Sequence, residues 1–286
     1  MSMKKINSLS DIADLYDFLF LDMYGVLWDG TALYPDIIPT LQSMRQMGKK
    51  VYILSNATTV GELFQSKLAQ LGLKLGQHYD GVITSGDVLA EKLQHHFFRT
   101  IGRRLDYKFY VIGRHNPMLL WSEIEHQVHD VSSADFVYVG SLIMNGVYPI
   151  TLDAFEPDLQ KALNKKIPLV CANPDYQALH GDLKYYCSGG VADWYEKHGG
   201  TVHWIGKPYS EIYAYVKQKT GADFKRSVMI GDTLRTDIAG ARTAGMDTVL
   251  ITEHGMTADE ISNGISLSDL CAKENVMPTY VLDKVK

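Results

Sequence analysis

Short apolar runs separated by amphipathic stretches are the main pattern along this chain. Each run holds four to six apolar or β-branched residues and ends at a small or polar residue. Such runs are too short for buried helices and are typical of strands covered on both faces. The runs lie at 17–22, 50–56, 81–87, 108–113, 135–141, 167–175, 201–208, 227–232 and 247–252. The tail at 280–282 is expected either to add an edge strand or to fray.

Helical spacing fills the gaps between these runs. Apolar residues recur three or four positions apart from Ile37 to Met47 and from Leu63 to Leu71, and a glycine follows each segment. Strands that alternate with helices predict right-handed βαβ units and a parallel sheet. An antiparallel sandwich needs a strand about every 8–12 residues. The runs here recur about every 25–35 residues, so that alternative is not favoured.

Composition and charge narrow the class of protein. A chain of 286 residues suggests two domains. With 46% hydrophobic and 21% charged residues it is neither disordered nor fibrous. The net charge of −5 leaves no excess of cations for a polyphosphate backbone, so nucleic acid is not an expected partner.

The sequence also indicates a compartment. The three cysteines, Cys171, Cys187 and Cys271, form no CxxC pair, and they predict reduced thiols rather than a disulfide framework or a zinc site. No apolar run approaches the ~18 residues of a membrane span, and the first residues lack the apolar core of a signal peptide. We therefore expect a cytoplasmic protein with no membrane partner.

Polar residues follow four of the predicted strands. In open parallel sheets ligands bind at the carboxyl ends of the strands. Asp22 follows the first run, Ser55 and Asn56 end the second, and Lys207 and Asp232 follow later ones. We expect all of them at the same edge of one sheet.

These residue types fit one kind of chemistry. Asp22 is placed as a nucleophile, while the Ser55 hydroxyl and Lys207 can hold an anion. Asp232 and Asp237 can hold a hard divalent cation such as Mg²⁺. Taken singly each feature is ordinary, because a strand-ending aspartate is often a helix cap and Gly-Lys-Pro is often a turn. Together they provide the parts needed for phosphoryl transfer.

The set resembles the haloacid dehalogenase (HAD) superfamily over almost the whole chain. The four motifs of that superfamily match DMYGVL at 22–27, SNATT at 55–59, GKP at 206–208 and GDTLRTD at 231–237. The long insertion after the second motif is similar to subclass IIA, which contains p-nitrophenyl phosphatase-like, nucleotide and sugar phosphatases. Further likenesses to that subclass lie at 82–93, 171–175 and 245–255.

The resemblance implies an α/β fold with two parts. A Rossmann-like parallel-sheet core with helices on both faces would span 1–99 and 201–286, and a smaller inserted α/β cap would span 100–200. The cap would close over the strand ends, exclude water and select the substrate. By resemblance the loop from Asn173 to Asp175 points toward the substrate, although an ordinary Asn-Pro turn has the same sequence. Dimers formed through the cap occur in this subclass, so a homodimer is compatible with the resemblance.

The resemblance also implies roles for the motif residues. Asp22 would form an aspartyl-phosphate, and Ser55, Asn56 and Lys207 would bind the phosphate of a small phosphorylated metabolite. Lys207 would also hold Asp22 near its metal ion.

A magnesium site follows from the same resemblance. Asp22, Asp232 and the backbone carbonyl of Tyr24 would ligate Mg²⁺, and Asp237 would support the metal ligands.

Tyr24 departs from the pattern of the phosphatases in this superfamily. They usually carry there a second aspartate that acts as general acid and base, a role that typically contributes ~10²–10⁴-fold in rate, or roughly 3–5.5 kcal/mol. Tyrosine, with a reference pKa of about 10, is a poor base at neutral pH. His115 and Asp175 are candidates for the missing acid.

Three functions remain open from the sequence. The first is a Mg²⁺-dependent phosphatase that is slow on alkyl phosphates and faster on aryl or acyl phosphates. The second is a catalytically impaired protein that binds phosphorylated metabolites. The third is a 2-haloacid dehalogenase, because an aspartate followed two positions later by tyrosine also occurs in those enzymes. A dehalogenase, however, has no use for the two acidic residues of the fourth motif.

Overall fold

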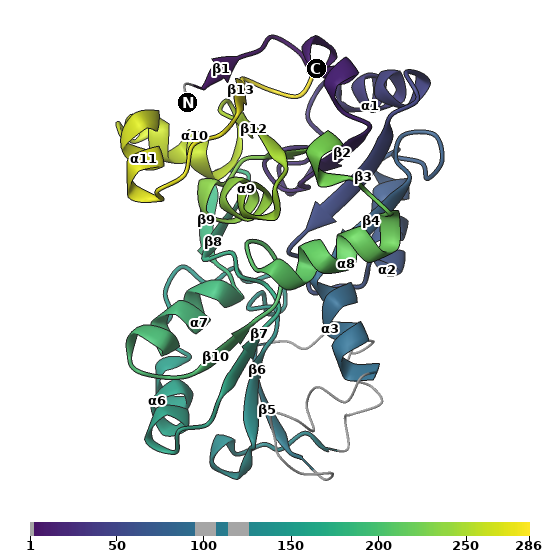
Figure 1. Ribbon diagram of the computed structural model, residues 1–286. Coiled ribbons are helices and arrows are strands. Elements are labelled where there is room, and N and C mark those ends of the chain that lie inside the picture. The colour runs from purple at the N-terminus through teal and green to yellow at the C-terminus, as the bar shows by residue number, and fades with distance from the viewer. Residues whose placement is uncertain (1–2, 95–106, 114–125) are drawn as a thin grey trace.

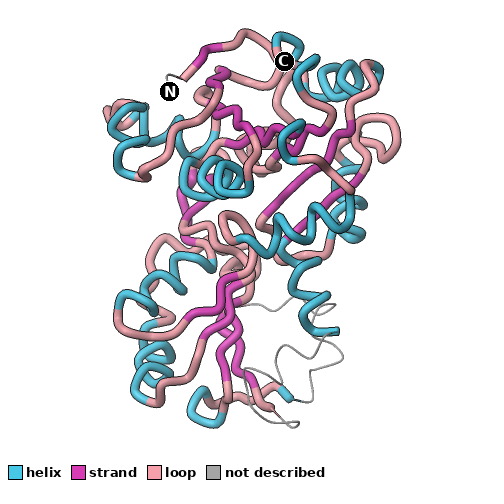
Figure 2. The backbone as a smooth tube through the Cα atoms, in the orientation of Figure 1, coloured by secondary structure: helices cyan, strands magenta, loops and turns pink. Residues whose placement is uncertain are grey.

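Two parallel sheets organise the chain (Figure 1). The computed structural model describes residues 3–94, 107–113 and 126–286. In this part of the chain, seven strands form the larger sheet, four form the smaller sheet, and two more pair as a hairpin. Figure 2 shows loops gathered between the two sheets.

The larger sheet has the strand order β1-β13-β12-β11-β2-β3-β4, and every neighbouring pair is parallel. Its strands span Lys4–Lys5 (β1), Phe18–Leu21 (β2), Lys50–Ser55 (β3), Gly81–Thr84 (β4), Ser227–Gly231 (β11), Asp247–Ile251 (β12) and Tyr280–Leu282 (β13). The expected edge position of the last strand is wrong, because β13 pairs with β12 on one side and β1 on the other.

Helices cover both faces of the larger sheet. Alternate residues of β2 face opposite ways: Leu19 and Leu21 pack in one apolar cluster with α1 and α2, and Phe20 packs in another with α3 and α8. These helices and their neighbours span Ile37–Gln46 (α1), Gly61–Gln70 (α2), Ser85–Gln94 (α3), Ser210–Thr220 (α8), Ala239–Ala244 (α9), Gly255–Ser262 (α10) and Leu267–Lys273 (α11). The predicted α/β fold with a Rossmann-like core is confirmed.

The smaller sheet has the order β10-β7-β6-β5 and is also parallel. Val137 and Val139 pack beneath its helices, whereas Phe136 and Tyr138 face the cluster that contains Phe20, so the two sheets share apolar contacts. Its elements span Phe109–Ile112 (β5), Phe136–Val139 (β6), Glu156–Asn164 (α6), Leu169–Cys171 (β7), Ser188–Lys197 (α7) and Val202–Trp204 (β10). The last strand lies just beyond residue 200, where the sequence placed the end of the insertion.

A hairpin that the apolar pattern did not predict connects the smaller sheet to the larger one. It consists of Gln177–His180 (β8) and Leu183–Tyr186 (β9), which pair antiparallel. The N–H of Gly181 at its turn donates to the carbonyl of Asp29 at 3.1 Å, and Lys184 pairs with Asp259 of α10 at 2.7 Å. The hairpin therefore closes one side of the region between the sheets.

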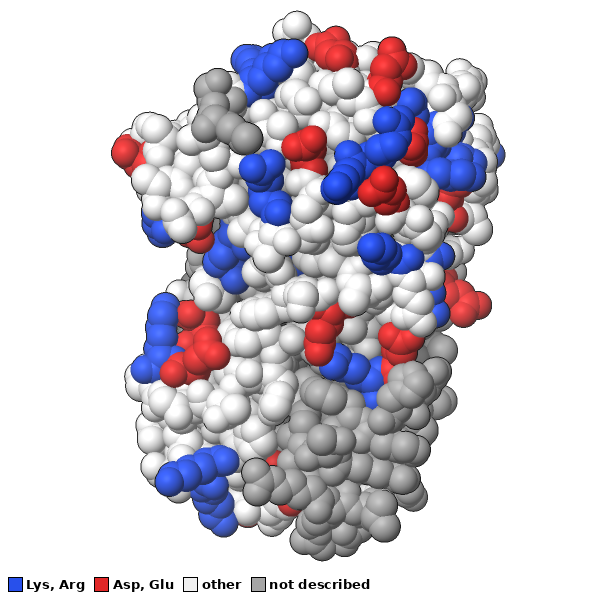
Figure 3. All heavy atoms as spheres, viewed as in Figure 1, with Lys and Arg blue, Asp and Glu red and all other residues white. Residues whose placement is uncertain are grey.

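Short helical turns complete the fold at Leu9–Asp11 (η1), Ala13–Leu15 (η2), Val131–Ser133 (η4), Phe224–Arg226 (η5) and Leu234–Ile238 (η6), the last a π-helical turn. Within the described residues, no helix is both long and apolar enough to cross a membrane. Figure 3 shows basic and acidic side chains interspersed over the visible face of the molecule.

Candidate active site

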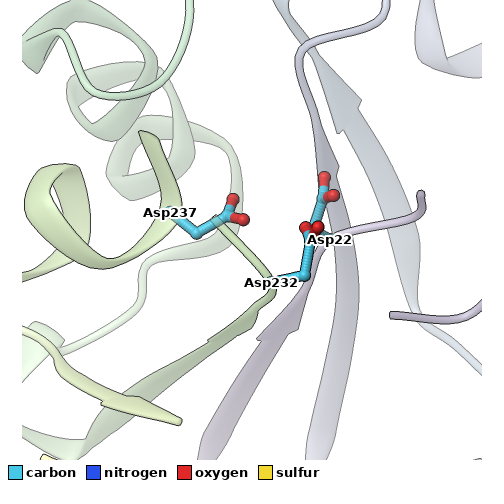
Figure 4. A group of neighbouring side chains, drawn as sticks. All are labelled: Asp22, Asp232 and Asp237. Carbon is cyan, nitrogen blue, oxygen red and sulfur yellow. The ribbon is translucent and has the colours of Figure 1, made fainter. Parts of the chain in front are cut away.

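Three carboxylates meet at the carboxyl end of the larger sheet. Asp22 follows β2, Asp232 follows the adjacent strand β11, and Asp237 lies in the turn η6. One carboxylate oxygen from each lies within 4.8 Å of the others, and Figure 4 shows the groups gathered from these elements. An all-oxygen set of this size fits a hard divalent cation such as Mg²⁺.

The loop after Asp22 passes close to Asp232. Gly25 has φ of +78°, and a Cβ atom there would lie 2.6 Å from the Asp232 carboxyl group, so only glycine fits. Within the described residues, nothing donates a hydrogen bond to the carbonyl oxygen of Tyr24, which leaves it able to ligate a cation. The N–H of Met256 at the start of α10 donates to Asp232 at 2.6 Å and orients its carboxylate.

Lys207 is the buried cation of the site, with an exposed fraction of 1%. Its Nζ donates to Asp22 at 2.7 Å, to Asp237 at 2.7 Å and to the carbonyl of Leu54 at 2.8 Å. Burial lowers the pKa of Lys207, but the carboxylates of Asp22 and Asp237 outweigh it and raise that pKa above its ordinary value. The ammonium therefore stays charged.

One expectation about Lys207 is wrong. This residue follows β10, which belongs to the smaller sheet, and not a strand of the sheet that carries Asp22. The long side chain bridges from one sheet to the other, so the predicted group still assembles around Asp22.

Burial and mutual repulsion act on the carboxylates. Burial raises the pKa of Asp22 to about 7, against the opposing effect of Lys207 and with a further rise caused by Asp237. Burial and the charge of Asp237 raise the pKa of Asp232 well above its ordinary value. One ammonium does not balance three carboxylates, and this imbalance favours a bound cation.

Ser55 and Asn56 lie beside this cluster but differ in their contacts. The Ser55 hydroxyl accepts from the N–H of Ala57 at 3.2 Å and lines a cavity together with Asp22. The Asn56 side chain accepts from the N–H of Lys207 at 2.7 Å and donates to Asp175 at 3.0 Å. Asn56 thus joins the loops that carry Lys207 and Asp175, and a direct phosphate contact by its side chain stays a prediction.

The loop after β7 brings Asp175 to the site. The Asn173 side chain accepts from the N–H of Asp175 at 3.1 Å, and this contact orients the backbone that carries the Asp175 carboxylate. Asp175 lines the two cavities that contain Asp22, and burial raises its pKa. Asn173 lines one of them.

Arg235 is a residue that the sequence did not single out. Its guanidinium donates to the carbonyl of Pro174 and lies 3.5 Å from the ring centre of Tyr176. Because Arg235 belongs to η6, it connects the turn that carries Asp237 to the loop that carries Asp175. Its place in the fourth motif was visible in the sequence, but its partner was not.

Tyr24 lines the same two cavities as Asp175. Its ring centre lies 4.7 Å from that of Trp28, and burial raises the pKa of its hydroxyl. Tyr24 therefore cannot act as a base near neutral pH. His115, the other candidate for the missing acid, lies outside the described residues.

Two family descriptions match separate parts of the chain. The haloacid dehalogenase-like hydrolase family matches residues 19–125, and the HAD-hydrolase-like family matches residues 204–286. These segments contain all four sequence motifs.

Curated relatives align over nearly the full length. Glycerol-3-phosphate phosphatase of Rattus norvegicus is 26% identical over 298 residues, which cover 94% of this chain and 88% of the relative. The 4-nitrophenylphosphatase of Schizosaccharomyces pombe is 23% identical over 287 residues, which cover 90% of this chain and 91% of the relative.

Solved structures share the fold. A haloacid dehalogenase-like family hydrolase of Brucella suis is 24% identical with a TM-score of 0.81, covering 98% of this chain and 100% of that one. The 4-nitrophenylphosphatase of Thermotoga maritima is 22% identical with a TM-score of 0.68, covering 96% of each chain. The two family matches, together with the assembled motifs, identify this chain as a member of the haloacid dehalogenase-like hydrolase family, and the solved structures share its fold.

Proposed function

We propose that this chain is a Mg²⁺-dependent phosphatase that hydrolyses a small phosphorylated metabolite through an aspartyl-phosphate on Asp22. The observation that carries the proposal is the contact of Lys207 with Asp22 and Asp237, both at 2.7 Å, beside the three-carboxylate cluster. This arrangement offers a nucleophile, a fixed cation and a metal site around one point. The printed names of the relatives, glycerol-3-phosphate phosphatase and 4-nitrophenylphosphatase, support a phosphate monoester as substrate.

The residues divide the reaction between them. A carboxylate oxygen of Asp22 forms a bond to phosphorus while the bond from phosphorus to the leaving oxygen breaks. Lys207 keeps the reacting carboxylate in place, and Ser55 holds a phosphate oxygen. Bound Mg²⁺, held by Asp22, Asp232 and the carbonyl of Tyr24, would neutralise charge on the phosphate. Water then hydrolyses the acyl phosphate, which releases inorganic phosphate and restores Asp22.

Asp175 is the group that we assign to the leaving oxygen. It lies in both cavities next to Asp22, and burial raises its pKa, so that it can carry a proton closer to neutral pH than an exposed aspartate. The proton moves from the Asp175 carboxyl to the leaving oxygen as the ester bond breaks. The carboxylate can then accept a proton from the attacking water.

Tyr24 favours a second candidate function, a binder of phosphorylated metabolites with little turnover. Burial raises the pKa of its hydroxyl, so Tyr24 does not replace the acid–base aspartate, while the cluster of Asp22, Asp232 and Asp237 supports binding of a metal ion. Dehalogenation is less well supported, because it uses neither Asp232 nor Asp237.

The test is hydrolysis of p-nitrophenyl phosphate with Mg²⁺, with EDTA, and by the Asp22→Asn variant. We expect turnover that both EDTA and the substitution abolish. Turnover that changes neither with EDTA nor with the Asp22→Asn substitution would refute the proposed mechanism. Absence of turnover on a broad panel of phosphate esters, together with thermal stabilisation by some of them, would favour the binder. Chloride release from a 2-chloro acid would instead support the dehalogenase.

A further inference from the structure

Two cavities of different charge meet at Asp22. They share Tyr24, Asp175 and Ala178 as well as Asp22 itself. The first, of about 490 Å³, contains the metal-binding carboxylates and also the acidic residues Asp29, Asp182, Glu253 and Asp259. The second, of about 410 Å³, contains Ser55 and further hydroxyl groups from Thr58, Thr59, Ser141 and Ser188.

Lys67 is the one cation among the described residues that line the second cavity. It lies in the last turn of α2, and its Nζ lies 3.8 Å from the ring centre of Trp28 and 6.0 Å from that of Tyr24. Aromatic faces attract cations but do not neutralise their charge.

No carboxylate of the described residues forms an ion pair with Lys67. Burial lowers its pKa below the ordinary value, because the ammonium is partly removed from water. A partly desolvated cation without a counter-charge is a ready partner for an anion.

We propose that the second cavity holds the leaving group of the substrate and that this group carries an anion of its own, paired with Lys67. The inference rests on the proposed phosphatase function and specifies its substrate class. Because Ser55 would bind the phosphate from the side of the second cavity, the ester oxygen and the carbon chain can extend into it. The acidic residues of the first cavity repel a second anion and direct it to Lys67. The substrate class is a phosphate ester with a carboxylate or a second phosphate a few atoms from the ester oxygen.

Three two-carbon esters test this charge preference at nearly constant size. 2-Phosphoglycolate carries a carboxylate, 2-hydroxyethyl phosphate a hydroxyl, and phosphoethanolamine an ammonium group. We expect kcat/KM of the wild type to fall in that order. In Lys67→Gln, the ratio of kcat/KM between the anionic and the neutral ester should fall on the order of tenfold, mainly through KM, as for loss of one charge-assisted contact. Lys67→Arg should keep most of the ratio. A short bisphosphate such as 1,2-ethanediol bisphosphate distinguishes a second phosphate from a carboxylate.

The control is Lys219→Gln. Lys219 lies 5.0 Å from the ring centre of Tyr215 on the exposed side of α8, so it also contacts an aromatic ring but lines neither cavity. This variant should keep the wild-type ratio. Equal ratios in wild type and Lys67→Gln would overturn the inference and assign Lys67 a structural role.

The outcomes also separate this inference from the proposed function. Hydrolysis of p-nitrophenyl phosphate with no preference among the three esters overturns the role of Lys67 and leaves the phosphatase intact. If no ester is hydrolysed, dissociation constants measured by calorimetry with Mg²⁺ provide the same ratio. If the wild type binds the anionic ester selectively and Lys67→Gln loses this selectivity, the inference about Lys67 is supported although the phosphatase proposal fails. No binding of any ester overturns both.

Discussion

Replacing Asp22 by asparagine should stabilise the metal-free protein at alkaline pH. Ionised Asp22 is held among other buried acids, and burial raises its pKa from 3.8 to about 7. Asparagine has nearly the same shape and can still accept the hydrogen bond from Lys207, but it carries no charge. The substitution that removes the proposed nucleophile thus also removes an electrostatic cost to folding.

The sign and size follow from proton linkage. Between pH 4 and pH 7 the folded metal-free protein retains a proton on Asp22 that the unfolded chain has lost. The free energy of unfolding therefore decreases as pH rises through this range. At 1.36 kcal/mol per pKa unit, the loss approaches about 4 kcal/mol. Asp22→Asn should match the wild type near pH 4.5 and exceed its stability by about this amount at pH 8.5.

Thermal or urea unfolding in EDTA at several pH values measures the difference. About 4 kcal/mol corresponds to a rise of roughly 10 °C in Tm at pH 8.5. Asp14→Asn is the matched control, because Asp14 is exposed, and it should follow the wild type at every pH. Equal stability of Asp22→Asn and wild type at pH 8.5 would show that the Asp22 charge is already compensated in the folded protein, so that the cluster needs no bound cation to balance it.

Three further predictions concern the metal, Tyr24 and the loop before Lys207. Mg²⁺ should raise the Tm of the wild type more at pH 8 than at pH 6, because the carboxylates that bind it must be deprotonated. Asp232→Asn should lose most of that rise, and an equal rise in both proteins would place the metal elsewhere. Tyr24→Asp should increase kcat on alkyl phosphates by on the order of 10²-fold if the missing acid limits turnover; an unchanged or lower rate in steady-state assays would show that the site depends on tyrosine. Gly206→Ala should lower kcat and should lower the free energy of unfolding by about 2 kcal/mol or more, because φ at Gly206 is +119° and a Cβ atom would lie 2.7 Å from the Asn56 amide oxygen. A variant with wild-type kinetics and Tm would refute the requirement for glycine at this position.

The strands of the larger sheet and the aspartates that follow them could be predicted from the sequence, because apolar runs and the residues next to them are short-range patterns. Phe18–Leu21 and Ser227–Gly231 are apolar runs followed directly by Asp22 and Asp232, and two adjacent parallel strands place such residues side by side. The pairing of Lys207 with Asp22 was predicted from motif order and not from strand position. Its strand belongs to the other sheet, and sequence spacing carries no information about which sheet a strand joins.

The hairpin β8–β9 shows why the shape of the site could not be predicted. Its strands contain Gln177, His180 and Lys184, which lack the apolar run of a covered strand because the hairpin lies at the surface between the sheets. Ala178 of this hairpin lines both cavities at Asp22.

Specificity therefore depends on tertiary contacts made by segments of ordinary composition. Lys67 illustrates the same limit, since in the sequence it is one lysine in the last turn of an amphipathic helix, where a cation also suits the helix dipole. Only its position over Trp28, at the wall of a cavity that contains Asp22, distinguishes a specificity residue from a helix-end cation. The reaction can be inferred from motifs, because the nucleophile, the cation and the metal ligands must be residues of particular types. The leaving group, in contrast, is selected by the side chains that the fold brings to the second cavity.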